Sequence, residues 1–326
     1  MNQPIVVLGG YGRVGRHCVL ELVTRTRAPL RIAGRNAQRA ESLALSVGER
    51  ASATYTDAAD TRILARTLEG AAAVVACCGG DMLAVLQTAL ELRVPVVSLS
   101  PVPLDPRHKS HLADRAWQAQ VPVVLHAGAV PGIPGLLAES LVRRVPAIHS
   151  LRIASTGPFA ATETAAADQR AQRLALAAES RRGRRLPELW RFSDPVGRRA
   201  VGGATSADLA GFAATHLVRD LGYLEPREGA LARAMARVVT RSSGAGFAVS
   251  ARAFAAADAN EPAAEIEVSG PDILVLAAAL AAGVTAAIGE GKVAAGLSLA
   301  REALSPALQL ADLEKRGARV RFAGHA

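Results

Sequence analysis

The sequence predicts an α/β protein in which a parallel, doubly wound sheet is followed by a second domain of the α+β class. Three observations support this expectation. Short apolar strands alternate with helices over about the first 125 residues, a glycine-rich turn joins the first strand to the first helix, and the alternation stops at about residue 147. We therefore expect one domain at residues 1–146, a second at residues 147–280, and a C-terminal segment at residues 281–326.

The first half of the chain repeats strand and helix. The first strand is Ile5–Leu8, and apolar residues at helical spacing then predict a helix from Arg13 to about Thr26. Further strands are expected at Leu30–Ala33, Ala51–Tyr55, Ala73–Ala76, Val94–Val97 and Val121–Leu125, and further helices after Asn36 and at Thr61–Leu68, Met82–Leu92 and Pro106–Gln120. Because most of these strands are apolar along their whole length, they predict a parallel sheet covered on both faces.

Gly10, Gly12 and Gly15 form a Gly-x-Gly-x-x-Gly spacing. The spacing alone is weak, since a chain with 29 glycines produces it by chance. Here it lies between a strand and a helix, where bare backbone lets a pyrophosphate approach the helix N-terminus. It predicts a dinucleotide-binding Rossmann domain whose phosphate loop also includes Arg13 and Val14. The alternative is an ordinary glycine turn.

The end of the second strand selects between NAD and NADP. NAD-selective domains place Asp or Glu there to bind the ribose 2′-hydroxyl, but this strand ends in Ala33-Gly34-Arg35-Asn36. The guanidinium of Arg35 can instead bind a 2′-phosphate through parallel hydrogen bonds, so we expect NADP as the cofactor. The alternative is that Arg35 is a solvated arginine in an arginine-rich chain. Arg13 is a second candidate for the same phosphate.

Three further residues stand where strands end on the cofactor side of such a sheet. Asp57 follows the third strand, and Cys77 and Gly79 follow the fourth, beside the expected nicotinamide ribose. We expect all three to line the cofactor site, with glycine allowing close approach of the backbone. A nucleophilic role for Cys77 requires a base or a positive charge that the sequence does not reveal.

Composition restricts the partners. The formal charge is +9, but 35 of the 38 basic residues are arginines scattered among alanines and only 3% of residues are aromatic, so we expect no nucleic-acid partner. Apolar runs such as 273–282 fall short of the ~20 residues of a membrane helix, and a strand begins at once, leaving no room for a signal peptide. We expect a cytoplasmic protein with no membrane partner. The three cysteines show no metal-ligand spacing, so we expect no metal and no structural disulfide.

Several segments resemble the saccharopine dehydrogenase-like reductases. They are 6–15, 32–36 with 40–44, the segment 126–133 with its Pro131-Gly132 pair, and the C-terminal stretch 280–317. The resemblance implies hydride transfer between NADP and a carbon–nitrogen bond of a small metabolite, substrate contacts at Pro131 and Gly132, and a C-terminal segment that packs back near the nucleotide domain. One departure is the apolar run Ile133-Pro134-Gly135-Leu136, where the family often has a polar residue.

The second half predicts a mixed α+β domain that binds the substrate or forms a homodimer. Strands are expected at Leu151–Ser155, Ala248–Phe254 and Glu265–Val268, and a helix at Thr164–Glu179. The basic run 181–185 is typical of a solvated loop, with anion binding as the alternative. The segment 195–199 is similar to one inserted near the substrate in relatives.

His126 is the expected catalytic acid or base, because it stands at the carboxyl end of a parallel strand. The alternative is that it caps the strand or hydrogen-bonds a neighbouring loop. The sequence as a whole favours an NADP-dependent oxidoreductase acting on an imine, or on a ketone, of a small molecule. A non-catalytic NADP-binding sensor or accessory protein is the alternative.

Overall fold

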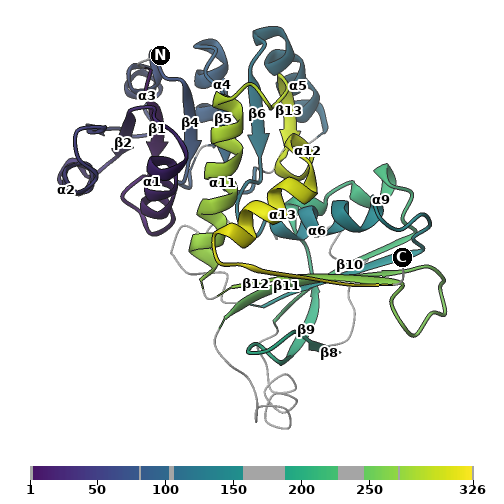
Figure 1. Ribbon diagram of the computed structural model, residues 1–326. Helices are drawn as coiled ribbons and strands as arrows, with labels where there is room; N and C mark the ends of the chain where they lie inside the picture. The colour runs from purple at the N-terminus through teal and green to yellow at the C-terminus, as the bar shows by residue number, and fades with distance from the viewer. Residues whose placement is uncertain are drawn as a thin grey trace. The chain divides into compact units, whose positions relative to one another are not determined.

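The computed structural model describes residues 3–80, 82–102, 106–156, 188–226, 246–270 and 272–324. The chain divides into two units, the first of residues 1–129 and 274–305 and the second of residues 130–273 and 306–326 (Figure 1). The expected helix at 164–179 and the basic run at 181–185 lie outside the described residues.

The first unit contains a seven-stranded parallel sheet in the order β13-β6-β5-β4-β1-β2-β3. Its strands are β1 (Ile5–Leu8), β2 (Leu30–Gly34), β3 (Ala51–Tyr55), β4 (Ala73–Ala76), β5 (Val96–Ser98), β6 (Pro122–Leu125) and β13 (Gly296–Leu299). The predicted parallel, doubly wound sheet is confirmed. The direction of strand order reverses between β1 and β4, and ligands of open α/β sheets bind at such a reversal.

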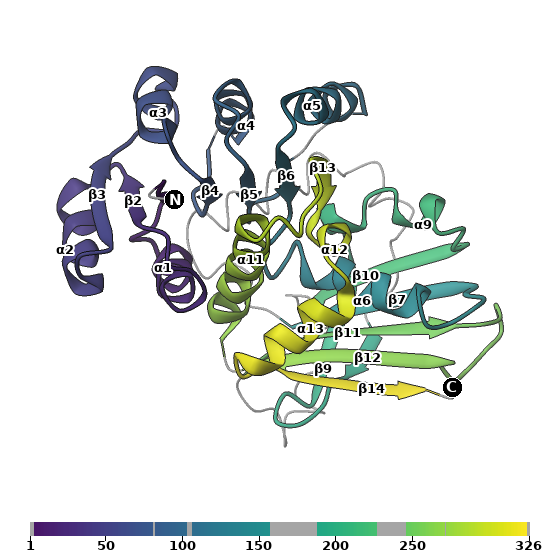
Figure 2. The ribbon, with the colours of Figure 1, turned by 45° about the horizontal axis from the view of Figure 1, so that its top comes forward.

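Helices cover both faces of this sheet (Figure 2). One face carries α3 (Thr61–Leu68), α4 (Met82–Glu91) and α5 (Pro106–Ala119), and the other carries α1 (Arg13–Arg25), α2 (Ala37–Val47) and α11 (Ile273–Gly289). The C-terminal part of the chain therefore supplies a helix and an edge strand to the first sheet, and the sequence analysis had expected neither element by itself.

The second unit contains a curled, mixed sheet in the order β14-β12-β11-β7-β10-β9-β8. Its strands are β7 (Ser150–Ser155), β8 (Glu188–Arg191), β9 (Arg198–Ala204), β10 (Asp220–Pro226), β11 (Phe247–Phe254), β12 (Ala264–Gly270) and β14 (Arg319–Gly324). Among the described strands of this second sheet, only β7 and β10 pair in parallel. Helix α6 (Ile133–Val142) packs on β7, β11 and β12, and α13 (Pro306–Lys315) packs on α6. The expected α+β class is confirmed.

The boundary between the units differs from the expected one. We expected the first domain to continue to residue 146, but the first unit ends at Ala129, because α6 buries its apolar residues against the second sheet. The expected C-terminal segment is likewise divided, with residues 281–305 in the first unit and 306–326 in the second. Helical periodicity predicts an apolar face but not the sheet that covers it.

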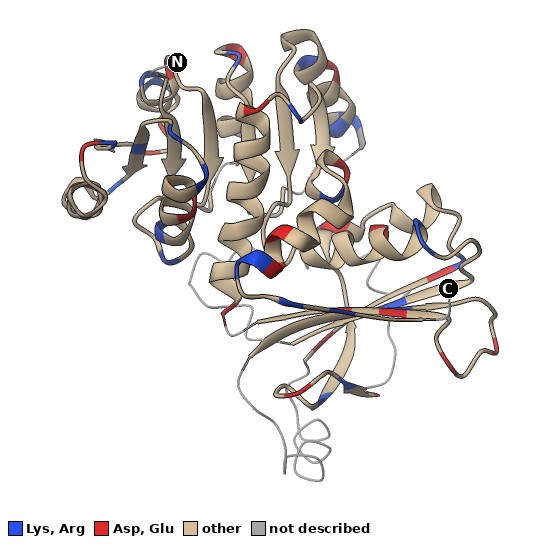
Figure 3. Ribbon diagram, in the orientation of Figure 1, with Lys and Arg blue, Asp and Glu red and all other residues tan. Residues whose placement is uncertain are grey.

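Basic and acidic positions are interspersed along the helices of the first unit and across the strands of the second (Figure 3). Opposite charges pair within this pattern, as in the contacts of Arg25 with Glu21 and of Arg252 with Glu265. Among the described helices, none is both long and apolar enough to cross a membrane.

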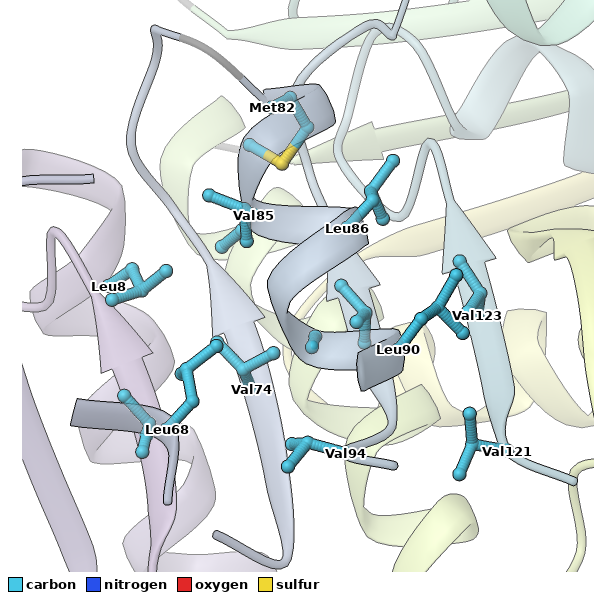
Figure 4. Packing of buried hydrophobic residues seen from close by; sticks show 14 of the residues in the cluster. Leu8, Leu68, Val74, Met82, Val85, Leu86, Leu90, Val94, Val121 and Val123 are labelled. Atoms are coloured by element: carbon cyan, nitrogen blue, oxygen red, sulfur yellow. The ribbon is translucent and has the colours of Figure 1, made fainter. Parts of the chain in front are cut away.

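The core of the first unit fixes the ends of the strands. Between the sheet and helix α4, the buried residues Leu8, Val74, Val85, Leu86 and Val123 interlock (Figure 4). Strands β1 and β4 are buried at every position. Because such close packing leaves little freedom, the loops that follow these two strands begin from rigid positions.

Candidate cofactor site

The glycine-rich turn begins directly at the end of β1. Gly9 has φ +72°, in the left-handed region that favours glycine, and its N–H donates to the carbonyl of Ala33 at the end of β2 (2.7 Å). Gly12 then donates to the carbonyl of Gly9 (2.8 Å), which closes the turn. The chain reverses over these residues and enters α1 at Arg13.

Close approach of the backbone requires glycine at one position of the motif and favours it at a second. A Cβ on Gly15 would lie 2.2 Å from the carbonyl oxygen of Gly9, and a Cβ on Gly12 would lie 3.0 Å from the same atom. Gly12 is the N-cap of α1, and no side chain among the described residues caps this helix end. The first-turn N–H groups, including those of Val14 and Gly15, therefore form the type of helix N-terminus that binds a phosphate group.

The end of β4 contacts this turn. A Cβ on Gly9 would lie 3.1 Å from Cβ of Cys78 and 3.2 Å from the carbonyl oxygen of Cys77. The carbonyl of Cys78 accepts a hydrogen bond from the hydroxyl of Ser100 (3.3 Å). A hydrogen bond with Cys18 and burial raise the pKa of the Cys77 thiol, so Cys77 suits a wall of the site better than a nucleophile. Gly79 follows in the same loop, half-buried.

Tyr11 joins the glycine turn to the end of β2. Its hydroxyl accepts a hydrogen bond from the backbone N–H of Asn36 (2.9 Å), and a Cβ on Gly34 would lie 2.6 Å from its ring. The guanidinium carbon of Arg39 lies 4.9 Å from the centre of the same ring. Tyr11 and Arg39 were not predicted as site residues from the sequence, because their contacts join residues 25 and 28 positions apart.

Arg35 is exposed at the carboxyl end of β2, and no described residue pairs with its guanidinium. Arg13 is also exposed, in the first turn of α1. Asp57 uses one carboxylate oxygen within its own turn, where it accepts the N–H of Ala59 (3.1 Å). The corner that would hold the adenosine ribose therefore carries arginines and no acidic residue directly after β2.

His126 follows β6 with φ +60° and is only 5% exposed. Its Nε2 accepts a hydrogen bond from the N–H of Val102 (3.4 Å), which places the proton of a neutral ring on Nδ1. The ring thereby ties the loop after β5 to the end of β6. This contact is of the loop-fixing kind that we gave as the alternative to catalysis.

The Pro131-Gly132 turn lies in the second unit and is held by Asp208, a residue that sequence analysis missed. Asp208 is 2% exposed, and its Oδ2 accepts the N–H groups of Gly132 (2.8 Å) and Gly135 (2.7 Å). The hydroxyl of Ser206 donates to the other oxygen. A carboxylate from a distant segment therefore caps helix α6. The N–H of Gly132 is already occupied, so a substrate could use only other atoms of this turn.

The second unit also buries a tyrosine among polar groups. The hydroxyls of Tyr223 and Ser155 are 2.7 Å apart. Burial and the negative charge of Glu225 raise the pKa of Tyr223 well above its ordinary value. Tyr223 is therefore a neutral phenol that can donate or accept a hydrogen bond.

The comparisons with known proteins agree with this geometry. Residues 9–124 match the model of the NAD(P)H-binding family. The apo structure of histidine-tagged saccharopine dehydrogenase (L-Glu forming) from Saccharomyces cerevisiae aligns with 99% of this chain and 100% of its own, with a TM-score of 0.69 at 11% identity. The chain has the saccharopine dehydrogenase fold. This confirms the expected resemblance at the level of the fold.

GenD2 from gentamicin A biosynthesis, in complex with NAD, has a more distant likeness to this chain. It aligns with 97% of this chain and 92% of its own, with a TM-score of 0.50 at 15% identity. A comparison with curated protein sequences gives no match. Residues 9–124 of the first unit thus match an NAD(P)H-binding domain, and the chain as a whole has the fold of the yeast saccharopine dehydrogenase structure.

Proposed function

We propose that this protein is an NADP-dependent oxidoreductase that transfers a hydride to or from a C=N group of a small metabolite, with a C=O group as the second choice. The observation that carries the proposal is the corner formed by the glycine turn and the end of β2. Gly12 and Gly15 leave room for a pyrophosphate at α1, and an exposed Arg35 stands where NAD-selective domains place an acid.

The residues present fit a bound dinucleotide. A side chain at Gly15 would collide with the carbonyl of Gly9, and one at Gly12 would make a tight contact with it, so the backbone of this turn is kept bare. The bound cofactor supplies the hydride donor or acceptor. The glycine turn and the first turn of α1 hold the phosphates, Arg35 orients the adenosine end, and Cys77 and Gly79 form the wall after β4.

We propose that His126 takes part in proton transfer. For this role, its Nε2 must release the N–H of Val102 and hydrogen-bond to the substrate or to water instead. In the arrangement observed, Nε2 is an acceptor, so it can take up a proton but has none to give. The variant His126→Gln separates two roles. If His126 only positions its neighbours, the variant should alter cofactor binding and leave the pH profile of kcat unchanged. If His126 transfers a proton, the pH profile of kcat should change.

The second candidate function is a non-catalytic NADP-binding sensor or accessory protein. The run 133–136 favours it, because Ile133 and Leu136 are fully buried and offer no polar group to a substrate. Both functions need the same first unit.

The two functions separate in one experiment. The purified full chain is mixed with NADPH and a panel of oxo acids, aldehydes and ketones, each with and without amino acids or amines, and loss of NADPH is followed by absorbance. Oxidation that requires an amine partner supports imine reduction, and oxidation with the carbonyl compound alone supports ketone reduction. Tight NADPH binding without oxidation of any pair contradicts the proposal and favours the sensor.

A further inference from the structure

The side chains at the corner between the glycine turn and α2 form a connected set. Tyr11, in the glycine turn, has its ring against Gly34 and its hydroxyl on the N–H of Asn36. The side chain of Asn36 accepts the N–H of Arg39 (2.9 Å) and so caps α2. Residues from the turn, from the end of β2 and from the first turn of α2 are thereby fixed relative to one another.

Arg39 is the charged member of this set. Its guanidinium lies over the ring of Tyr11 at 4.9 Å, and its Nη2 lies 3.5 Å from the carbonyl oxygen of Tyr11. Such stacking orients a guanidinium while leaving most of its N–H donors for another partner. Arg39 is exposed, and with the described residues its side chain makes no other hydrogen bond, ion pair or ring contact. The charge is therefore positioned, and no described acidic residue neutralises it.

The position of this charge matters because of where β2 ends. In a dinucleotide-binding domain the ribose 2′ position lies at the end of the second strand, and here that strand ends at Gly34, against which the Tyr11 ring packs. Arg35 is the next residue in the chain, and Arg39 is held over that ring by Tyr11. Two arginines thus stand at this corner, one with no partner among the described residues and one whose guanidinium lies over an aromatic ring.

We propose that Arg39 is a second guanidinium for the 2′-phosphate of NADP, beside Arg35, and that Tyr11 is the residue that positions it. This inference rests on the proposed NADP-dependent function. The 2′-phosphate is a monoester whose own charge is close to −2, so two cations match it. The 2′-hydroxyl of NAD is uncharged and gains nothing from the second cation. Selectivity for NADP then depends on three residues, of which sequence spacing identifies only Arg35.

The test uses ligands that differ only in the 2′-phosphate. Dissociation constants are measured for NADPH and NADH by nicotinamide fluorescence, and for 2′,5′-ADP and 5′-AMP by competition, on the full chain and on Arg39→Ala. We expect Arg39→Ala to weaken NADPH and 2′,5′-ADP on the order of tenfold, while NADH and 5′-AMP change less than about twofold. Arg62→Ala is the matched control, because Arg62 is an exposed arginine in the first turn of α3, the helix after β3.

Variants at Tyr11 test the positioning role. Tyr11→Phe keeps the ring under the guanidinium and should retain most of the preference for 2′,5′-ADP, whereas Tyr11→Leu should lose as much of it as Arg39→Ala does. Equal weakening of both ligand pairs by Arg39→Ala, or no weakening, overturns the inference while leaving the proposed function standing. An unmodified protein that binds neither NADPH nor 2′,5′-ADP overturns the proposed function itself, and the inference with it.

Discussion

Gly15 and Gly9 approach so closely that a Cβ on Gly15 would lie 2.2 Å from the carbonyl oxygen of Gly9. A Cβ atom and an oxygen atom at this distance would overlap, so Gly15→Ala must move α1 away from the end of β1. We expect the variant to lose measurable NADPH binding and roughly 1–3 kcal/mol of unfolding free energy. Fluorescence titration and urea unfolding check both. Gly289→Ala is the control, because a Cβ at Gly289 meets nothing within 4 Å; unchanged NADPH affinity in Gly15→Ala would contradict the assignment of the turn.

Asp208 should be among the costliest side chains of the second unit to remove. Asp208→Ala leaves the N–H groups of Gly132 and Gly135 without their acceptor in a buried position. We expect a loss of about 2–4 kcal/mol of unfolding free energy, measured by urea denaturation. Asp258→Ala, in an exposed turn, serves as the control. Equal midpoints for the two variants would show that the cap contributes nothing to stability.

Glu267 should make stability depend on pH. Burial raises its pKa, as does the charge of Glu265, while hydrogen bonds from Ser193 and the charge of Arg321 oppose the rise. When the pKa of a carboxyl group is higher in the folded than in the unfolded protein, its contribution to stability is complete at pH values below the unfolded pKa. That contribution is lost as the pH rises through the pKa of the group in the folded protein.

The unfolding free energy should therefore fall as the pH rises from the ordinary carboxyl pKa through the raised pKa of Glu267. Glu267→Gln should flatten this part of the curve, because glutamine does not ionise. Glu261→Gln, at an exposed loop position, should leave it unchanged. A slope of the same size in the Glu267→Gln protein would assign the effect to other groups. Chemical denaturation at a series of pH values provides the measurement.

Cys77 should react slowly with alkylating reagents. Its thiol shares a hydrogen bond with Cys18, and that bond and burial raise the pKa, so little thiolate forms near neutral pH. Mass spectrometry after a timed iodoacetamide reaction should find Cys77 labelled far more slowly in the folded protein than in urea. Equal rates in the two states would contradict the hydrogen-bonded thiol pair and would support a nucleophilic role for Cys77.

The sequence predicted most of the first unit because its elements carry local signals. Apolar strands, helical periodicity and the glycine spacing each lie within a few residues of chain. Strand β14 lacks such a signal, because five of its six residues are exposed and no alternation remains. Strand β13 is only four residues long and takes its place by pairing with β6, far earlier in the chain.

The site was predicted less completely for a related reason. Arg35 follows from its position at the end of a strand, which is a local property. The contact between Asp208 and Gly132 joins residues 76 positions apart, and the contact between Arg39 and Tyr11 joins residues 28 apart. Neither pair has a sequence signature, since both depend on how completed elements pack. His126 shows the converse, because its position at a strand end did not reveal that its ring nitrogen accepts the N–H of Val102.

The most direct test of the account is the relative affinity of the unmodified chain for NADPH and NADH, repeated on Arg35→Ala. The account predicts that NADPH binds more tightly by about tenfold or more, and that Arg35→Ala removes most of this difference by weakening NADPH alone. Equal affinity for the two cofactors in the unmodified protein would contradict it.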